Sequence, residues 1–70
     1  MNKPKVDDVV RLTGDIPELD LFKGQKGVVR SRWCEPTPAY EVEFVTGNRY
    51  PLRTLLLAQQ LTVAGEMSRN

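Results

Sequence analysis

Residues 39–45, Ala-Tyr-Glu-Val-Glu-Phe-Val, decide the fold class of this chain. Apolar and acidic side chains alternate along the segment, and successive side chains of a β-strand point to opposite faces of the sheet. We therefore expect a half-buried strand here. Its two faces divide the residues: the core side carries Tyr40, Val42 and Phe44, and the solvent side carries Glu41 and Glu43.

Four more short segments of β-forming residues flank this strand, separated by turns rich in glycine and proline. Pro51 has no amide hydrogen to donate, so its strand is expected at a sheet edge or at a bulge. The pattern predicts a small all-β domain of five strands, with one short 3-10 turn before the last strand. We expect the other strands over residues 8–13, 27–33, about 49–55 and 61–63, and the 3-10 turn over residues 57–60.

The longest connection runs from residue 15 to residue 26 and carries several apolar side chains. We expect it to fold back and cover one end of the core. Gly24 and Gly27 are expected to turn the chain into the second strand, because glycine adopts positive φ without steric cost. The apolar residues of the connection are Ile16, Leu19, Leu21 and Phe22.

Composition excludes several kinds of chemistry. The chain has 70 residues, one cysteine and no histidine. It therefore predicts a single domain without an internal disulfide, without the usual zinc ligands and without a histidine-based catalytic site. The net charge of +1 lacks the basic excess of a dedicated nucleic-acid binder. We expect no enzyme activity, no cofactor and no bound metal. Self-association stays open as a support for the small core, although a well-packed barrel can also stand alone.

The organisation expected along the chain is simple. Residues 1–5 would form an N-terminal arm, residues 6–63 the barrel, and residues 64–70 a flexible C-terminal tail. The arm lacks the apolar run of a secretory signal, and no apolar run approaches the roughly 20 residues that cross a bilayer. A lone thiol, Cys34, also suits a reducing compartment. We therefore expect a cytoplasmic protein with no membrane contact.

Several of these motifs occur together in one known family. Residues 9–12 (Val-Val-Arg-Leu), 15–19 (Asp-Ile-Pro-Glu-Leu), 23–29 (Lys-Gly-Gln-Lys-Gly-Val-Val) and 40–44 (Tyr-Glu-Val-Glu-Phe) resemble a family of small bacterial proteins known only as a domain of unknown function, the one numbered 4926. The resemblance covers roughly residues 6–63 and departs from the pattern at Tyr50-Pro51. The order of the elements looks like an SH3-like barrel, so the resemblance implies that fold and no activity.

A looser resemblance covers only residues 23–29. This hairpin is similar to the KOW motif of ribosomal and transcription proteins, whose modules contact RNA or protein. The turn chemistry is common to many barrels, so the resemblance by itself adds little to the interpretation.

The charged side chains allow two interpretations. Arg30 and Arg32 are expected on the outer face of the second strand, where they would pair with Glu41 and Glu43 in a cross-strand ladder. The alternative is a free basic surface that meets an acidic partner. Arg49 and Arg53 are the better candidates for that surface, because they have fewer acidic neighbours in the sequence.

Three aromatic residues are candidates for partner binding. Phe22, Trp33 and Tyr50 are expected to form a half-exposed platform of the kind that SH3-like barrels use for peptides. The alternative is that they only cap the ends of the barrel. Cys34 has only Arg32 as a nearby cation, so it is expected to take no part.

Three functional hypotheses remain open. The first is a non-catalytic protein-interaction module, such as a regulator, a subunit or an immunity-type partner, which binds another protein or a second copy of itself. Its candidate residues are Phe22, Trp33, Arg49, Tyr50 and Arg53. The alternative is a nucleic-acid-binding barrel of the KOW or tudor kind. The third is a purely structural domain. No small-molecule substrate is evident.

Overall fold

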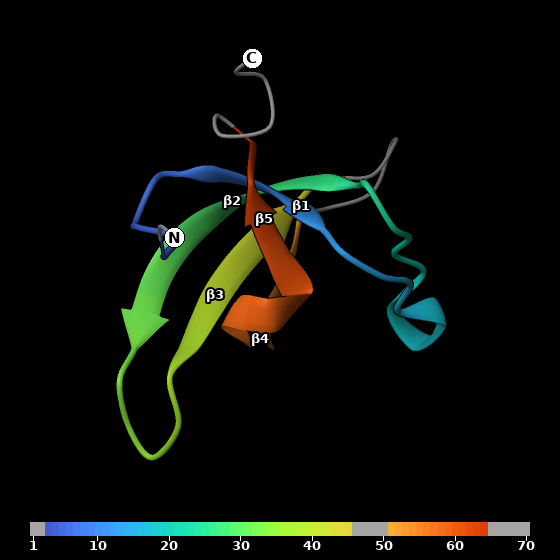
Figure 1. Cartoon of the computed structure of the whole chain (residues 1–70). Helices are drawn as coiled ribbons and strands as arrows, with labels where there is room; N and C mark the ends of the chain where they lie inside the picture. Colours follow the sequence, from blue (N-terminus) through green and yellow to red (C-terminus); the bar gives the residue numbers. More distant parts are fainter. Residues whose placement is uncertain (1–2, 46–50, 65–70) are drawn as a thin grey trace.

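The computed structural model describes residues 3–45 and 51–64. It confirms the all-β class, the five strands and the single 3-10 turn before the last strand, and it adds an earlier 3-10 turn (Figure 1). The elements in chain order are β1 (Val9–Leu12), η1 (Pro17–Leu19), β2 (Lys26–Trp33), β3 (Ala39–Phe44), β4 (Leu52–Leu56), η2 (Ala58–Gln60) and β5 (Leu61–Val63).

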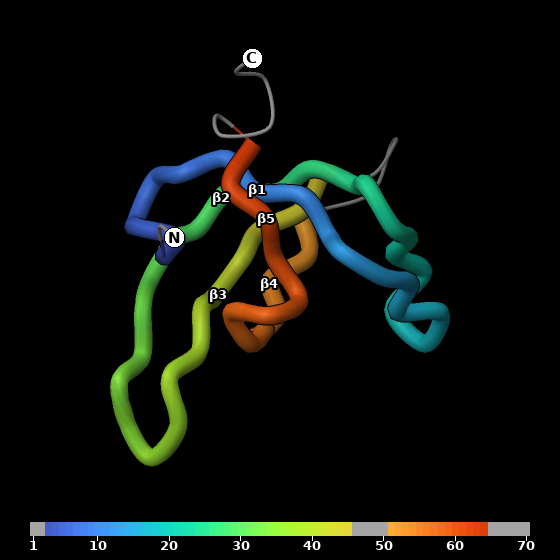
Figure 2. Tube along the Cα trace, viewed as in Figure 1, coloured from blue at the N-terminus to red at the C-terminus, as the bar shows by residue number. Residues whose placement is uncertain are grey.

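The strands form one antiparallel sheet with the order β4-β3-β2-β1-β5. The sheet is bent around a single core, because Leu56 of β4 and Leu61 of β5 come from its opposite edges and belong to the same buried cluster. Figure 2 shows the curved path that brings β5 across the sheet. No pairing joins β4 to β5 in the described part of the chain, so the domain is barrel-like and its sheet is not closed.

The alternation in β3 sets the inner face of the sheet. Tyr40, Val42 and Phe44 are buried, whereas Glu41 and Glu43 remain partly accessible to solvent, as predicted. The other buried hydrophobic residues of the core come from every other strand and from the long connection: Val10, Leu12, Leu21, Val29, Leu56 and Leu61.

The connection before β2 covers one end of the core, as the sequence predicts. Leu21 is fully buried, and Ile16 and Leu19 pack against the core cluster. The amide of Ile16 donates to the carbonyl of Leu21 (2.8 Å), which closes the loop around η1. Phe22 departs from this pattern, because its side chain is 49% exposed.

The two glycines at the start of β2 have different roles. Gly24 has a φ of +88°, and its carbonyl accepts a hydrogen bond from Nη1 of Arg11 (2.8 Å). Gly27 lies inside β2 rather than in the turn, and no positive φ accompanies it. A Cβ at this position would lie 2.7 Å from Val42 Cγ1 and 2.8 Å from the Phe44 ring. The expected turn role of Gly27 is therefore wrong, and close packing explains the residue.

β4 begins later than the expected strand over residues 49–55. Pro51 precedes it, and β4 lies at an edge of the sheet, as the proline predicted. Arg49, Tyr50 and most of the expected tail lie outside the described residues. Among the residues described, no helix is long and apolar enough to span a membrane.

Candidate partner-binding surface

A β-bulge in β2 decides which arginines share a face. Val29 pairs with Val42, but the next pair joins Ser31 to Glu41, and Arg32 then pairs with Tyr40. Residues directly opposite each other project to the same side of the sheet. Arg32 therefore lies on the side of Tyr40, not on the outer face. The bulge is the reason, because one extra residue in β2 shifts the alternation of every residue after it.

The outer face carries a ladder of charged side chains centred on Glu43. Oε1 of Glu43 accepts hydrogen bonds from Nε of Arg30 and from Nε of Arg53, both at 3.1 Å. Nη1 of Arg53 also lies 3.9 Å from Oε2 of Glu41. Ser31 donates to Oε1 of Glu41 (2.7 Å), in the place predicted for Arg32. The predicted ladder is confirmed with this one replacement.

The ladder removes Arg53 from the proposed free basic surface. Its guanidinium already meets two carboxylates, because β4 pairs with β3 and brings Arg53 opposite Glu43. Arg30 is paired in the same way, and Arg32 faces the other side. Arg49 lies outside the described residues. Arg30, Arg32 and Arg53 therefore do not form one basic face.

We expect the ladder to make the stability of the fold depend on pH. The hydrogen bond from Arg30 is the main cause that holds the pKa of Glu43 below its ordinary value. Nearby charges of Arg30 and Arg53 act in the same direction. A carboxyl with a lowered folded-state pKa stabilises the fold above its unfolded pKa, and this contribution is lost as pH falls through the folded value.

We therefore expect Glu43→Gln to lose stability at neutral pH and to depend less on pH in the acid range than the wild type. Urea unfolding midpoints measured from neutral pH down to about pH 3 check this. Glu18→Gln, an exposed change in η1, serves as the control and should keep the wild-type slope. Parallel pH curves for the wild type and Glu43→Gln would contradict the role of the ladder.

Phe22 and Trp33 do not form a common aromatic platform. Both are half exposed, at 49% and 52%. Phe22 precedes the start of β2, whereas Trp33 is its last residue. A strand rises about 3.3 Å per residue, so the two ends of β2 lie roughly 23 Å apart, and Phe22 and Trp33 lie at opposite ends of this strand. The expectation of one platform is wrong for this pair, and Tyr50 lies outside the described residues.

Trp33 instead belongs to an apolar patch that the sequence did not reveal. It pairs with Ala39, and Leu55 pairs with Glu41, so both side chains project from the outer face. Leu57 continues in an extended conformation (φ −86°, ψ 159°) and shares the side of Leu55. We call Trp33, Leu55 and Leu57 the outer apolar patch; their exposed fractions are 52%, 54% and 37%.

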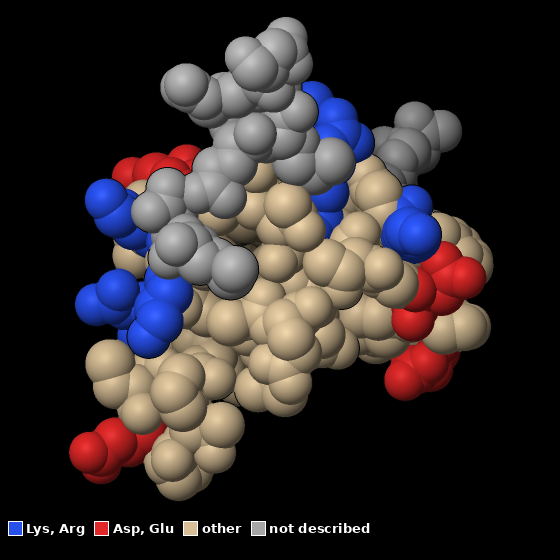
Figure 3. Space-filling model, in the orientation of Figure 1, with Lys and Arg blue, Asp and Glu red and all other residues tan. Residues whose placement is uncertain are grey.

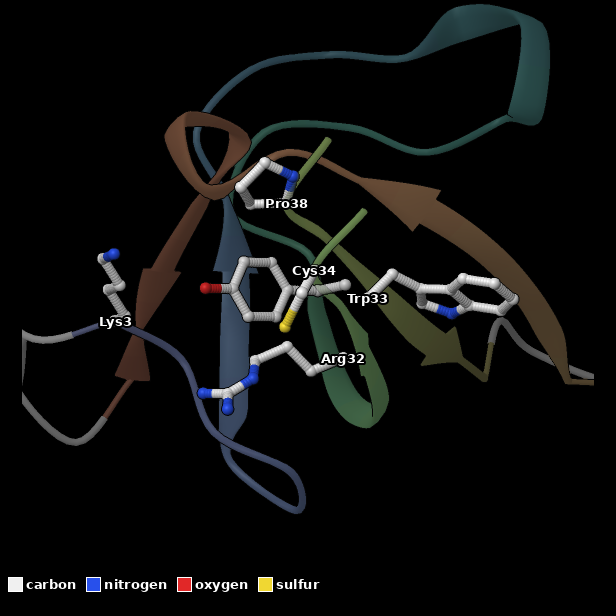
Figure 4. Close-up of a pocket in the computed structure, with 6 residues that line it drawn as sticks. Lys3, Arg32, Trp33, Cys34 and Pro38 are labelled. Carbon is white, nitrogen blue, oxygen red and sulfur yellow. The ribbon is translucent and has the colours of Figure 1, made fainter. Parts of the chain in front are cut away.

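A pocket lies beside this patch, on the side of the sheet that carries Arg32. Figure 4 shows Arg32 and Lys3 on one side of it, and the indole of Trp33 pointing the other way. Figure 3 shows basic side chains gathered at the left of the view, with acidic side chains above and below them. The pocket has a volume of about 270 Å³ and is lined by Lys3, Arg32, Trp33, Cys34, Pro38 and Tyr40.

The five strands define a small barrel-like all-β domain built from one bent antiparallel sheet, and this domain carries the outer apolar patch and the pocket. The chain belongs to the family described as Domain of unknown function (DUF4926), whose model matches residues 7–63. This confirms the family that the motifs predicted. No curated protein and no solved structure gives a significant match.

Proposed function

We propose that this chain is a non-catalytic interaction module that binds a protein partner through the outer apolar patch. The observation that carries the proposal is the presence of Trp33, Leu55 and Leu57 together on the solvent-facing side of the sheet. Large apolar side chains grouped on a surface mark interaction sites, and tryptophan is enriched among the residues that dominate binding energy.

The surroundings of the patch support a protein as the partner. Glu41 lies opposite Leu55, and Arg53 lies close to Glu41, so the apolar patch has the polar rim that is typical of protein interfaces. β4 is an edge strand, and no described residue pairs with its outer edge, so an added strand from a partner would suit it. The nucleic-acid alternative lacks a comparable observation, because Arg30 and Arg53 already hold carboxylates.

We expect Trp33→Ser to weaken partner binding at least about tenfold, because it removes the largest anchor of the patch. The partner is first captured from cells that encode the chain, identified by quantitative mass spectrometry and purified. Its dissociation constant is then measured by calorimetry with each variant. Phe22→Ser is the matched control, since it removes an equally exposed aromatic side chain beyond the other end of β2.

Two results would overturn the proposal. One is that the Trp33→Ser variant captures every protein that the wild type captures. The other is an equal dissociation constant for both variants. Light scattering tests whether a second copy of this chain occupies the patch. If the wild type and Phe22→Ser are dimers and Trp33→Ser is a monomer, the patch is a dimer interface and the proposal of a separate protein partner is wrong.

A further inference from the structure

We propose that the pocket between Lys3, Arg32 and Tyr40 binds a carboxylate group of the protein partner. The inference rests on the proposed function and adds to it the chemistry of the partner. The pocket lies on the side of the sheet opposite the outer apolar patch. Trp33 lies at the boundary between the pocket and the patch.

The fold holds Lys3 beside the end of β2. A turn reverses the chain before β1: the amide of Asp8 donates to the carbonyl of Lys5, and the amide of Lys5 donates to Oδ2 of Asp8, both at 2.9 Å. The amide of Asp7 donates to the carbonyl of Val29 (2.8 Å), which fixes the turn to β2. Pro4 is buried. The arm therefore packs on the domain and brings Lys3 to the pocket (Figure 4).

The bulge supplies the second cation. Because the alternation shifts after Val29, Arg32 leaves the carboxylates of the outer face and lines the pocket. Arg30 and Arg53 are bound by Glu43, but within residues 3–45 and 51–64 neither Lys3 nor Arg32 has an ion pair or side-chain hydrogen bond. Both cations are exposed and available to a ligand.

Tyr40 supplies a neutral donor. Its side chain lines the pocket and only 3% of the residue is exposed. Its hydroxyl has no hydrogen-bond partner among the described residues. Every side-chain polar atom that is buried in the described residues has a partner, so the Tyr40 hydroxyl is not a buried atom. The small exposed part of Tyr40 therefore includes the hydroxyl, which opens to the pocket.

These donors suit a carboxylate. A guanidinium presents paired N–H donors that match the two oxygens of a carboxylate, and an ammonium adds a second charge. A nucleic acid engages many phosphates, each with its own cation, whereas the pocket offers only Lys3 and Arg32 among its described lining residues. A single acidic group fits this site, and an acidic side chain next to an apolar one would suit the pocket and the neighbouring Trp33.

The test compares two blocked peptides, Ac-Leu-Glu-Leu-NH2 and Ac-Leu-Gln-Leu-NH2, by NMR titration of the labelled full chain. We expect the glutamate peptide to shift the amide signals of residues 32–34 and 40, and to bind at least about fivefold more tightly than the glutamine peptide. Arg32→Gln should abolish this preference, and Lys3→Gln should reduce it. Arg30→Gln, whose guanidinium is already paired with Glu43, is the control and should keep it.

Three outcomes would overturn the inference: equal affinity for both peptides, shifts confined to other residues, or a single-stranded oligodeoxynucleotide that binds these residues more tightly than the glutamate peptide. Equal affinity with shifts around Leu55 would leave the interaction module standing and remove only the carboxylate. If Trp33→Ser keeps the glutamate preference and the captured partner also still binds, the outer apolar patch would no longer be the partner site. The carboxylate site would then remain. Signal dispersion in each spectrum checks that the variant is folded.

Discussion

Phe44→Ala should remove about 3–5 kcal/mol of stability, the usual cost of deleting a large buried ring. Phe44 is fully buried on the inner face of β3 and belongs to the core cluster that both sheet edges share. A domain of this length has a total stability of roughly 4–10 kcal/mol, so the variant should be largely unfolded or close to it. Urea unfolding followed by far-UV circular dichroism and by the fluorescence of the single tryptophan measures the loss.

Two variants make this prediction specific. Phe22→Ala deletes the same atoms from a half-exposed side chain outside the core, so we expect a loss of about 1 kcal/mol or less. Phe44→Leu keeps most of the core volume and should give an intermediate, measurable loss if the alanine variant does not fold. Similar losses for Phe22→Ala and Phe44→Ala would show that the ring of Phe44 does not hold the two edges of the sheet together.

Gly27→Ala should destabilise the domain by about 1–3 kcal/mol or more, although it adds only a methyl group. The added Cβ would lie 2.7 Å from Val42 and 2.8 Å from the ring of Phe44, both of which are fully buried. Neither neighbour has free space to move into, because protein interiors are closely packed. Either β2 moves away from β3, or the Phe44 ring leaves its preferred conformation.

Gly14→Ala is the matched control, since a Cβ there meets nothing within 4 Å. It should be neutral or slightly stabilising, because alanine restricts the unfolded chain more than glycine does. The denaturation midpoints of the two variants, measured side by side, check the prediction. A Gly27→Ala protein as stable as Gly14→Ala would mean that the contact between β2 and the Phe44 ring is looser than described.

The candidate site was only partly predictable. Glu41 and Glu43 were expected to pair with arginines, and they do, because alternation in β3 places both on the outer face. The outer apolar patch was missed because a run of three leucines, residues 55–57, has no period of its own. Only the register of β4 against β3 shows that Leu56 points inward, whereas Leu55 lies with Glu41 on the outer face.

Local patterns in the sequence determined the inner face of β3, the 3-10 turn at η2 and the edge position of β4, because alternation and proline chemistry act within a few residues. The tertiary structure decided the side of the sheet on which Arg32 lies and the need for a residue without a side chain at position 27. Both depend on β3 lying against β2, where a bulge shifts the register and the Phe44 ring occupies the space of a side chain. Pairing between strands creates these constraints, so no window of sequence contains them.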